Sequence, residues 1–434
     1  MITEEKYALI GAGPSGLAGA RNLDRAGIAF DGFESHDDVG GLWDIDNPHS
    51  TVYESAHLIS SKGTTAFAEF PMADSVADYP SHVELADYFR DYADTHDLRR
   101  HFAFGTTVAD VSPVDSLWQV TTRSRSGETT VARYRGVIIA NGTLSKPNMP
   151  TFRGDFTGTL MHTSQYRSAE IFRGKKVLVI GGAGNSGCDI AVDAVHQAEC
   201  VDLSVRRGYY FVPPKYLFGR PSDTLNQGKP LPPWIKQRVD TLVLKQFTGD
   251  PVRFGFPAPD YKIYESHPVV NSLILHHIGH GDVHVRADVD RFEGGKTVRF
   301  VDGSSADYDL VLCATGYHLD YPFIAREDLD WSGAAPGPVP QRRESPPRQS
   351  LCSRHGRSIR SRVAGPFRAG RVGGQIDHRT YRSPRRGAGI LGGGGRSSSR
   401  SVRGGIQVPE VGTNGLLREQ GRLPIGDQAT HRTA

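Results

Sequence analysis

Cysteine is scarce in this sequence, and its four residues, Cys188, Cys200, Cys313 and Cys352, lie far apart. No two of them form a C-x-x-C pair, which excludes a disulfide scaffold and a zinc finger and is typical of a reducing cytoplasm. Runs of about 18–20 apolar residues are also absent, and the N-terminus lacks the basic-then-apolar pattern of a signal peptide. We therefore expect a cytoplasmic protein without a membrane span and without a metal site.

Lysine is absent from residues 335–434, which contain 19 Arg and 5 acidic residues. Their net charge is +14, whereas the residues before them carry a net charge of −11. This tail also holds 18 of the 50 glycines but only two aromatic residues, Phe367 and Tyr381. We expect the tail to be disordered. Because it lacks repeated R-G-G units and stacking aromatics, its arginines do not predict a nucleic-acid partner.

Before the tail, short apolar runs alternate with helix-like stretches. The sequence predicts strands at residues 6–10, 29–34, 137–140, 175–180, 201–205 and 310–313, and helices at residues 15–26, 83–96 and 189–195. Alternation of this kind favours parallel sheets and an α/β fold.

A glycine-rich turn, Gly11-Ala12-Gly13-Pro14-Ser15-Gly16, joins the first strand to the first helix. In such a turn the first Gly permits the tight bend, the second lets a pyrophosphate approach the backbone, and the third allows close packing. The helix N-terminus then offers free N–H groups to the phosphates. Glu34 ends the next strand about twenty residues on, where a carboxylate can bind ribose hydroxyls.

The same pattern recurs at Gly182-Ala183-Gly184-Asn185-Ser186-Gly187. The strand after this turn ends in Arg206 and Arg207 instead of an acid, which favours the 2′-phosphate of NADP over NAD. Two such turns imply two dinucleotide cofactors, most simply a flavin and a nicotinamide.

A longer motif lies between the two turns. Phe156-Thr-Gly158-Thr-Leu-Met-His162-Thr-Ser-Gln-Tyr166-Arg167 resembles the F-x-G-x-x-x-H-x-x-x-[YF]-[KP] fingerprint of flavin-containing monooxygenases. The resemblance runs from Tyr7 to about Ile324, roughly three quarters of the chain. Other stretches similar to this family are Gly40-Gly41-Leu42-Trp43, Phe70-Pro71-Met72, Tyr79-Pro80-Ser81-His82, Arg206-Arg207-Gly208-Tyr209, Lys215-Tyr216-Leu217-Phe218-Gly219 and Cys313-Ala314-Thr315-Gly316-Tyr317.

The resemblance assigns cofactor roles residue by residue. It implies that FAD is bound by Gly11, Gly13, Pro14, Ser15, Gly16 and Glu34, with Gly41, Leu42 and Trp43 near the flavin or adenine side and Val108 near the adenine. It implies that NADPH is bound by Gly182, Gly184, Asn185, Ser186, Gly187, Arg206 and Arg207. No catalytic side chain is implied, and His162 is expected to hold a turn between domains.

The fold class expected is therefore α/β, with two nested Rossmann-like domains followed by the tail. The FAD-binding domain comprises residues 1–171 and 310–334, and the NADP-binding domain is inserted at residues 172–309. The second glycine turn lies between the first turn and the Ala314-Thr315-Gly316 crossover, which motivates the nesting.

The resemblance implies an NADPH- and O₂-dependent monooxygenase. NADPH would pass a hydride to FAD, and the reduced flavin would capture O₂ as a C4a-hydroperoxide that oxygenates a nitrogen or sulfur nucleophile of a small molecule. Baeyer–Villiger monooxygenases, a related branch, usually carry Trp at the place of Tyr166, so N/S-oxygenation is favoured over that alternative. A homodimer is left open.

Two family positions depart from the pattern. Ile59 stands where the family often has an Asn beside the flavin, and Thr143 stands where it commonly has a His. The missing amide, for which Ser60 or Ser61 could substitute, leaves an uncoupled NADPH oxidase open as an alternative. The aberrant C-terminus leaves an inactive flavoprotein open.

The tail has the composition of a frameshift product. Read one base later, the codons of residues 348–375 permit D-N-L-F-V-A-G-M-V-E-A-S-G-L-G-W-Q-G-R-F-E-Q-A-E-L-V-A without a break. This string resembles the C-terminal segment of flavin monooxygenases. We therefore expect residues 335–434 to form no domain of their own.

Overall fold

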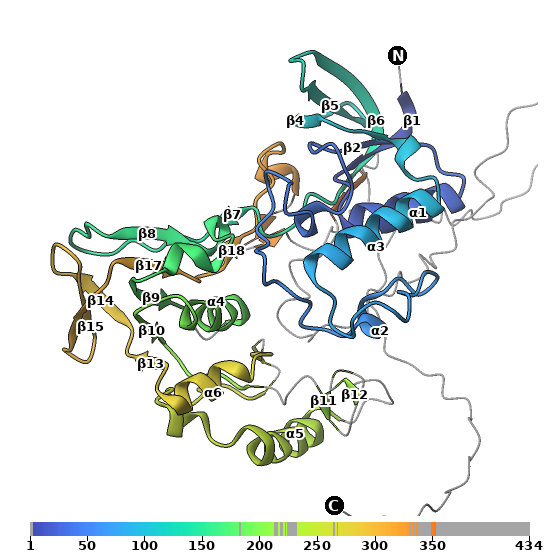
Figure 1. The fold of residues 1–434 in the computed structure, drawn as a ribbon. Coiled ribbons are helices and arrows are strands. Elements are labelled where there is room, and N and C mark those ends of the chain that lie inside the picture. Colours follow the sequence, from blue (N-terminus) through green and yellow to red (C-terminus); the bar gives the residue numbers. More distant parts are fainter. Residues whose placement is uncertain are drawn as a thin grey trace, which may run out of the picture.

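The computed structural model describes residues 3–181, 184–211, 216–217, 220–221, 223, 232–263, 265–266, 268–329, 331–332, 335–336 and 349–352. They form two α/β units, each built on its own sheet, with strands β7 (Lys146–Pro147) and β18 (Tyr317–His318) between them (Figure 1). We call residues 3–145 with 319–352 the first unit and residues 148–316 the second unit. The expected fold of two dinucleotide-binding domains is confirmed.

The first sheet has the strand order β3-β2-β1-β6-β5-β4. Strands β1, β2, β3 and the C-terminal half of β6 run parallel, whereas β4 and β5 form an antiparallel meander with β6. The sequence did not predict this meander, because its strands are only half buried and show few continuous apolar runs. The bounds are β1 Thr3–Ile10, β2 Phe30–Phe33, β3 Phe102–Ala103, β4 Thr106–Val114, β5 Leu117–Ser124 and β6 Thr129–Ile139.

Helices α1 (Pro14–Arg25) and α3 (His82–Thr95) pack on one face of the first sheet (Figure 1). Their apolar side chains recur at helical spacing and are buried there: Leu17, Ala20, Leu23, Leu85, Phe89 and Tyr92. Helix α3 begins with a capping box, in which Ser81 Oγ accepts the N–H of Glu84 and the Glu84 carboxylate accepts the N–H of Ser81. The other face buries Trp118, Tyr134 and Phe323.

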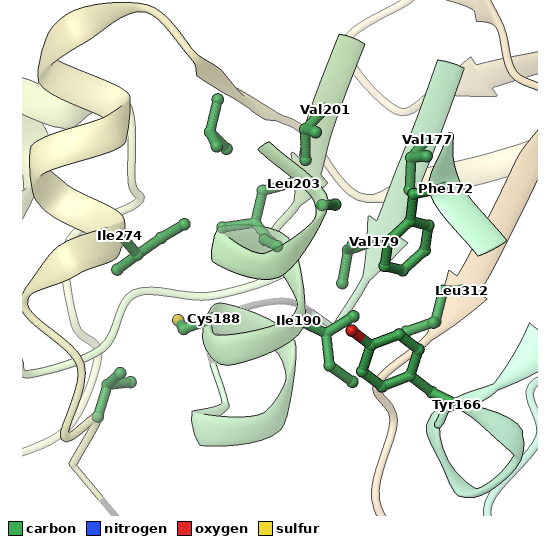
Figure 2. Close-up of a cluster of buried hydrophobic side chains, with 14 of the residues drawn as sticks. Tyr166, Phe172, Val177, Val179, Cys188, Ile190, Val201, Leu203, Ile274 and Leu312 are labelled. Atoms are coloured by element: carbon green, nitrogen blue, oxygen red, sulfur yellow. The ribbon is translucent and has the colours of Figure 1, made fainter. Parts of the chain in front are cut away.

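The second sheet consists of five parallel strands in the order β13-β10-β9-β17-β8. Helices α4 (Asn185–Val195) and α6 (Leu273–His280) lie on one face, and the antiparallel strands β14, β15 and β16 pack on the other. Figure 2 shows the helix side of this core, where Val177, Val179 and Leu203 from the strands meet Ile190 and Ile274 from the helices. The bounds are β8 Thr159–His162, β9 Lys176–Ile180, β10 Cys200–Ser204, β13 Val283–Arg286, β14 Val289–Phe292, β15 Thr297–Phe300, β16 Ser305–Asp307 and β17 Leu310–Cys313.

The second sheet extends past the domain boundaries expected at residues 172 and 309. Strand β8 precedes the first boundary and β17 follows the second, yet both pair within this sheet. The physical reason is burial: all four residues of β17 are buried and need a neighbour on each side, which β9 and β8 provide. The division into residues 172–309 and its flanks stays a prediction, and the sheet itself spans residues 159–313.

The two units are joined by two antiparallel segments at β7 and β18. Asn148 is the centre of this crossover: its N–H donates to Gly316 O (2.9 Å), its Nδ2 donates to Thr315 O (3.1 Å), and its Oδ1 contacts His318 Nε2 (2.9 Å). His162 Nε2 contacts Gly316 O at 3.0 Å, directly before β18, and its expected role in holding a turn between domains stays a prediction.

The tail requires one correction. Residues 349–352, expected to lack regular structure, form strand β21 (Gln349–Cys352) parallel to β6. They pair with residues 136–139 of β6, beyond the residues that pair with β5, and so cover a backbone edge that has no other ladder partner on that side among the described residues. Residues 353–434 lie outside the described residues.

The remaining elements are short or lie at the periphery. They are α2 Lys62–Thr65, α5 Pro233–Thr248, β11 Tyr216–Leu217, β12 Arg220–Pro221, β19 Trp331–Ser332, β20 Ala335–Pro336 and the 3₁₀ turns η1 Gly41–Trp43, η2 Arg99–His101, η3 Thr163–Gln165, η4 Ala169–Phe172, η6 Pro251–Phe254 and η7 Arg326–Leu329. Within the described part of the chain, no helix combines the length and the apolar character that crossing a bilayer requires.

Candidate functional site

Two glycines of the first turn are required by the chain's own packing. Gly11 has φ +100°, and a Cβ there would lie 2.6 Å from the carbonyl oxygen of Ala140. A Cβ on Gly16 would lie 1.8 Å from the carbonyl oxygen of Gly11. The tight bend and the close packing of helix on strand therefore exclude any side chain at either position.

Gly13 differs from its neighbours, because nothing in the described chain requires a glycine there. Its φ of −70° is ordinary, and a Cβ would make only ordinary contacts, with Gly41 Cα at 3.6 Å and Gly41 N at 4.0 Å. Gly13 precedes Pro14, the first residue of α1, whose N-terminus has no side-chain cap and no acidic residue in its first turn. A helix start without a side-chain cap, preceded by a glycine that the chain itself does not require, fits the phosphates of a dinucleotide.

Glu34 follows β2 and is buried beside this turn. One carboxylate oxygen, Oε2, accepts the N–H of Ala12 at 2.6 Å, and the other, Oε1, accepts the N–H of His36 at 2.9 Å. These bonds fix the carboxylate next to the glycine turn. Oε1 also accepts Ser35 Oγ at 3.2 Å, whereas Oε2 has a second lone pair that can still accept a ribose hydroxyl.

Gly41, Leu42 and Trp43 form η1 directly over the turn. The N–H of Gly40 donates to Ala12 O at 3.1 Å, which anchors the segment. Leu42 and Trp43 pack against the core of the second unit, and Trp43 also packs against that of the first. Val108, expected near adenine, is buried on the meander face in one cluster with Ile10 at the end of β1.

Asn141 is a residue of this region that the sequence analysis did not assign. Its Cα lies 3.3 Å from the position a Cβ on Gly11 would take, and its Nδ2 donates to Asp320 O at 3.2 Å. Its Oδ1 is buried and has no hydrogen-bond partner among the described residues. An acceptor left unpaired beside the glycine turn fits a ligand that donates a hydrogen bond. The sequence gives no local pattern for it, because only the pairing of β1 with β6 brings it to Gly11.

From Gly184 onward, the second turn is similar to the corresponding part of the first. Gly182 lies outside the described residues. Gly184 has φ −93° and caps α4, and a Cβ there would meet only Gly181 O at 4.0 Å. Helix α4 also begins without a side-chain cap and without an acidic first turn, so the same fit to a pyrophosphate holds. Ser186 is exposed on the first turn of α4, and Gly187 is buried behind it.

The side chain of Asn185 is used within the chain. Its Oδ1 accepts the N–H of Val270 at 2.7 Å and so ties the start of α4 to the segment before α6. Because Oδ1 is already bonded, Asn185 would contact a cofactor through its Nδ2 or its backbone.

The two arginines after β10 have different environments. Arg206 is exposed and makes no ion pair within the part of the chain that the structure describes. Arg207 lies between two rings, with its guanidinium carbon 5.3 Å from the Tyr209 centroid and 5.1 Å from that of Tyr261. It also donates to Ser266 Oγ at 2.9 Å. Arg206 is therefore free to meet a phosphate, whereas Arg207 is held by its stack.

In the loop where Ile59 replaces the Asn that the family often has, the side-chain hydroxyls bond to one another. Ile59 is half-buried, Ser60 Oγ lies 2.8 Å from Thr65 Oγ1, and Ser61 Oγ lies 3.4 Å from Thr64 Oγ1. Both serines are buried. Because each hydroxyl already has a partner in the loop, neither is presented as a ready replacement for an amide.

Side chains of the first unit and of the fingerprint contact α4. Tyr53 Oη lies 3.3 Å from Asp189 Oδ2, and Tyr166 Oη lies 2.8 Å from Asp193 Oδ2. Burial and the neighbouring aspartates raise the pKa of both phenols, so both act as hydrogen-bond donors. Because Tyr53 belongs to the first unit, its bond holds the helix of the second glycine turn against that unit, whereas the bond of Tyr166 lies within the second unit.

Comparison with known proteins gives the chain's relatives. Residues 4–330 match the family described as flavin-binding monooxygenase-like. Flavin-containing monooxygenase 5 of Homo sapiens is 31% identical over 343 residues, and flavin-containing monooxygenase 3 of Oryctolagus cuniculus is 32% identical over 340 residues. These matches cover 74% of this chain but 64% and 63% of the relatives, so the chain spans less than two thirds of their length.

Solved structures show the same fold. The flavin-containing monooxygenase from Stenotrophomonas maltophilia is similar with a TM-score of 0.58 at 22% identity, covering 77% of this chain and 85% of that one. The open crystal structure of cyclohexanone monooxygenase is similar with a TM-score of 0.57 at 21% identity, covering 73% and 74%.

Proposed function

Because the chain belongs to the flavin-binding monooxygenase-like family, we propose that it binds FAD and NADPH and uses O₂ to oxygenate a small molecule. Members of this family use these two cofactors. The observation that carries the proposal is the pair of glycines, Gly13 and Gly184: each precedes a helix without a side-chain cap, although the chain's own contacts would accommodate a Cβ there.

The chain's own residues would bind and orient the cofactors. In the first unit the FAD pyrophosphate would lie along the turn from Gly11 to Gly16, with its ribose at Glu34 and with Leu42 and Trp43 beside it. In the second unit the NADPH pyrophosphate would lie at Gly184 and the 2′-phosphate at Arg206. When bound, FAD supplies hydride acceptance and O₂ activation, so no acid–base side chain is required.

The contact between the two units would exclude water from the cofactor site. The bond of Tyr53 to α4 keeps the second glycine turn against the first unit, and Trp43 packs into both cores. A site that excludes water limits the release of hydrogen peroxide before the substrate is oxygenated.

We further propose nitrogen or sulfur of the substrate as the oxygenated atom, on the basis of Tyr166 in the fingerprint. A Baeyer–Villiger reaction is the second candidate, and the fold shared with cyclohexanone monooxygenase favours it. The full chain is assayed for NADPH oxidation, peroxide and oxygenated product with a thioether and with a cyclic ketone. Formation of sulfoxide without lactone supports oxygenation at nitrogen or sulfur, and formation of lactone supports the Baeyer–Villiger reaction. Hydrogen peroxide alone, in an amount equal to the NADPH consumed, indicates an oxidase. Ile59→Asn should lower the peroxide yield in that last case.

Flavin binding is tested with Gly13→Ala. The new Cβ has room in the chain itself, so the unfolding temperature of the flavin-free protein should not change, while the flavin content should fall to a small fraction of wild type. Gly19→Ala on the same helix is the matched control, since its Cβ would also lie 3.6 Å from its nearest neighbour, a Leu9 methyl. Wild-type flavin content in Gly13→Ala would contradict the proposed FAD site.

NADPH binding is tested in the same way with Gly184→Ala. We expect a raised KM for NADPH and an unchanged flavin content. Gly279→Ala on α6, whose Cβ would lie 3.8 Å from the Phe254 ring, is the control.

The homodimer and the cytoplasmic location stay predictions, and light scattering of the purified chain tests the former.

A further inference from the structure

A cysteine, an aspartate and a histidine far apart in the sequence meet on one face of the second sheet. Cys200 and Asp202 are alternate residues of β10 and therefore point to the same side. His284 of the edge strand β13 is the direct partner of Asp202 in the parallel register. Their ligand atoms all lie within 4.8 Å of one another.

The separations are those of ligands around a tetrahedral ion. Asp202 Oδ1 lies 3.3 Å from His284 Nδ1 and 3.7 Å from Cys200 Sγ. With Zn–S of about 2.3 Å and Zn–N or Zn–O of about 2.0 Å, tetrahedral geometry places N and O about 3.3 Å apart and S and O about 3.5 Å apart. The three atoms can therefore take up an ion with little movement.

The second carboxylate oxygen is held in place by the chain. Asp202 Oδ2 accepts Tyr308 Oη at 2.5 Å and Arg286 Nε at 2.7 Å, and the Arg286 guanidinium lies over the Phe300 ring. The Asp202 side chain is only 2% exposed, whereas His284 is 59% exposed. Hydrogen bonds to the non-ligating oxygen orient a metal-binding carboxylate, and the exposed imidazole opens a path from solvent.

We propose that Cys200, Asp202 and His284 bind a zinc ion, with water in the fourth position. A thiolate, an imidazole and a carboxylate are the ligand types that zinc takes, whereas magnesium and calcium take oxygen ligands. Binding releases the thiol proton of Cys200 and links the edge strand β13 to β10. The site is independent of the proposed dinucleotide sites.

The first experiment needs no variant. The reduced full chain is alkylated with iodoacetamide with and without Zn²⁺, and each cysteine peptide is quantified by mass spectrometry. We expect Zn²⁺ to slow alkylation of Cys200 at least tenfold and to leave the buried Cys188 and Cys313 unaffected as internal references. Unchanged alkylation of Cys200 would overturn the proposal.

The second experiment measures zinc binding by titration calorimetry. The wild-type chain should bind one zinc ion through this site, Cys200→Ser and His284→Gln should lose it, and Tyr308→Phe should weaken it about 10- to 100-fold. The control is His276→Gln, since His276 and His280 on α6 meet edge to face with ring centroids 4.0 Å apart and form the competing imidazole pair. Loss of binding in His276→Gln with retention in Cys200→Ser would overturn the proposal, as would no binding by the wild type.

Discussion

At the residue scale, the structure separates positions that the sequence treats alike. Gly11 and Gly16 are fixed by contacts with the chain, whereas Gly13 is free of them. Arg206 and Arg207 are neighbours in sequence, yet one faces solvent and the other is stacked between two tyrosines. The spacing of a motif therefore predicts where the turn lies. The contacts in the structure then separate the residues that the fold requires from those that a ligand would require.

The arginines give the first prediction of this scale. Arg206→Ala should raise the KM for NADPH about 10- to 100-fold, the loss of a charged hydrogen bond of about 1.5–3 kcal/mol, and should leave the KM for NADH unchanged. Arg207→Ala should instead lower the unfolding temperature, and Arg207→Lys should not restore it because Lys lacks the planar group. Steady-state kinetics with both coenzymes measure the first effect. Equal changes for NADPH and NADH in Arg206→Ala would refute its role at the 2′-phosphate.

His162 gives a prediction on pH. Burial lowers its pKa below 6.5, and its neutral ring donates through Nε2 to Gly316 O while Nδ1 accepts the N–H of Ser164. The unfolded chain therefore binds more protons, and the free energy of unfolding should fall as pH drops from 6.5 toward the lowered pKa. His162→Gln keeps one donor and one acceptor without titrating, so it should reduce this slope by up to about 1.4 kcal/mol per pH unit.

Urea unfolding at several pH values between 5 and 7.5 measures that slope. His49→Gln, at an exposed position, is the control and should behave as wild type. An identical slope in His162→Gln would show that the ring at the crossover does not titrate with folding.

At the element scale, β21 covers part of the edge of β6 in the first sheet. The strand supplies the only described partner for residues 136–139 of β6 on the side away from β1. An open parallel edge of this kind exposes N–H and C=O groups to other chains. The sequence missed this strand because its flanking residues have the composition of a disordered segment.

Ser350→Pro tests this pairing in the full chain. Proline lacks the backbone N–H and is unfavourable inside a strand, so in the middle of β21 it should lower the unfolding temperature by about 2–4 °C and increase aggregation. Ser345→Pro, placed before the strand, is the matched control. Differential scanning calorimetry and light scattering measure both, and equal behaviour of the two variants would indicate that β21 does not stabilise the sheet.

At the scale of the whole molecule, the first unit is assembled from both ends of the described chain, whereas the family match stops at residue 330. Strand β21 lies at the residues where the shifted frame permits Asn-Leu-Phe-Val, a more apolar strand than Gln-Ser-Leu-Cys. The proposed frameshift would thus have replaced a strand of the first sheet by a poorer one.

Restoring that frame gives the last prediction. The restored protein should be more soluble and should retain more FAD per chain, because an apolar strand would bury more surface against β6. Flavin-to-protein absorbance ratio and the soluble fraction on expression are the measurements. The coding DNA provides the control: an uninterrupted gene in close relatives that encodes the same Arg- and Gly-rich tail would end the hypothesis.

The sequence by itself determined the two glycine turns, the strands and helices around them, and the family, because these depend on local spacing. The tertiary structure alone decided what depends on residues far apart: the antiparallel meander, the place of β21, Asn141 beside Gly11, and His284 beside Cys200 and Asp202. In parallel sheets neighbouring strands are joined by long crossovers, so Asp202 and His284, which are direct partners in the register, lie about eighty residues apart in the chain. No local pattern records such a meeting, and only the register of the strands produces it.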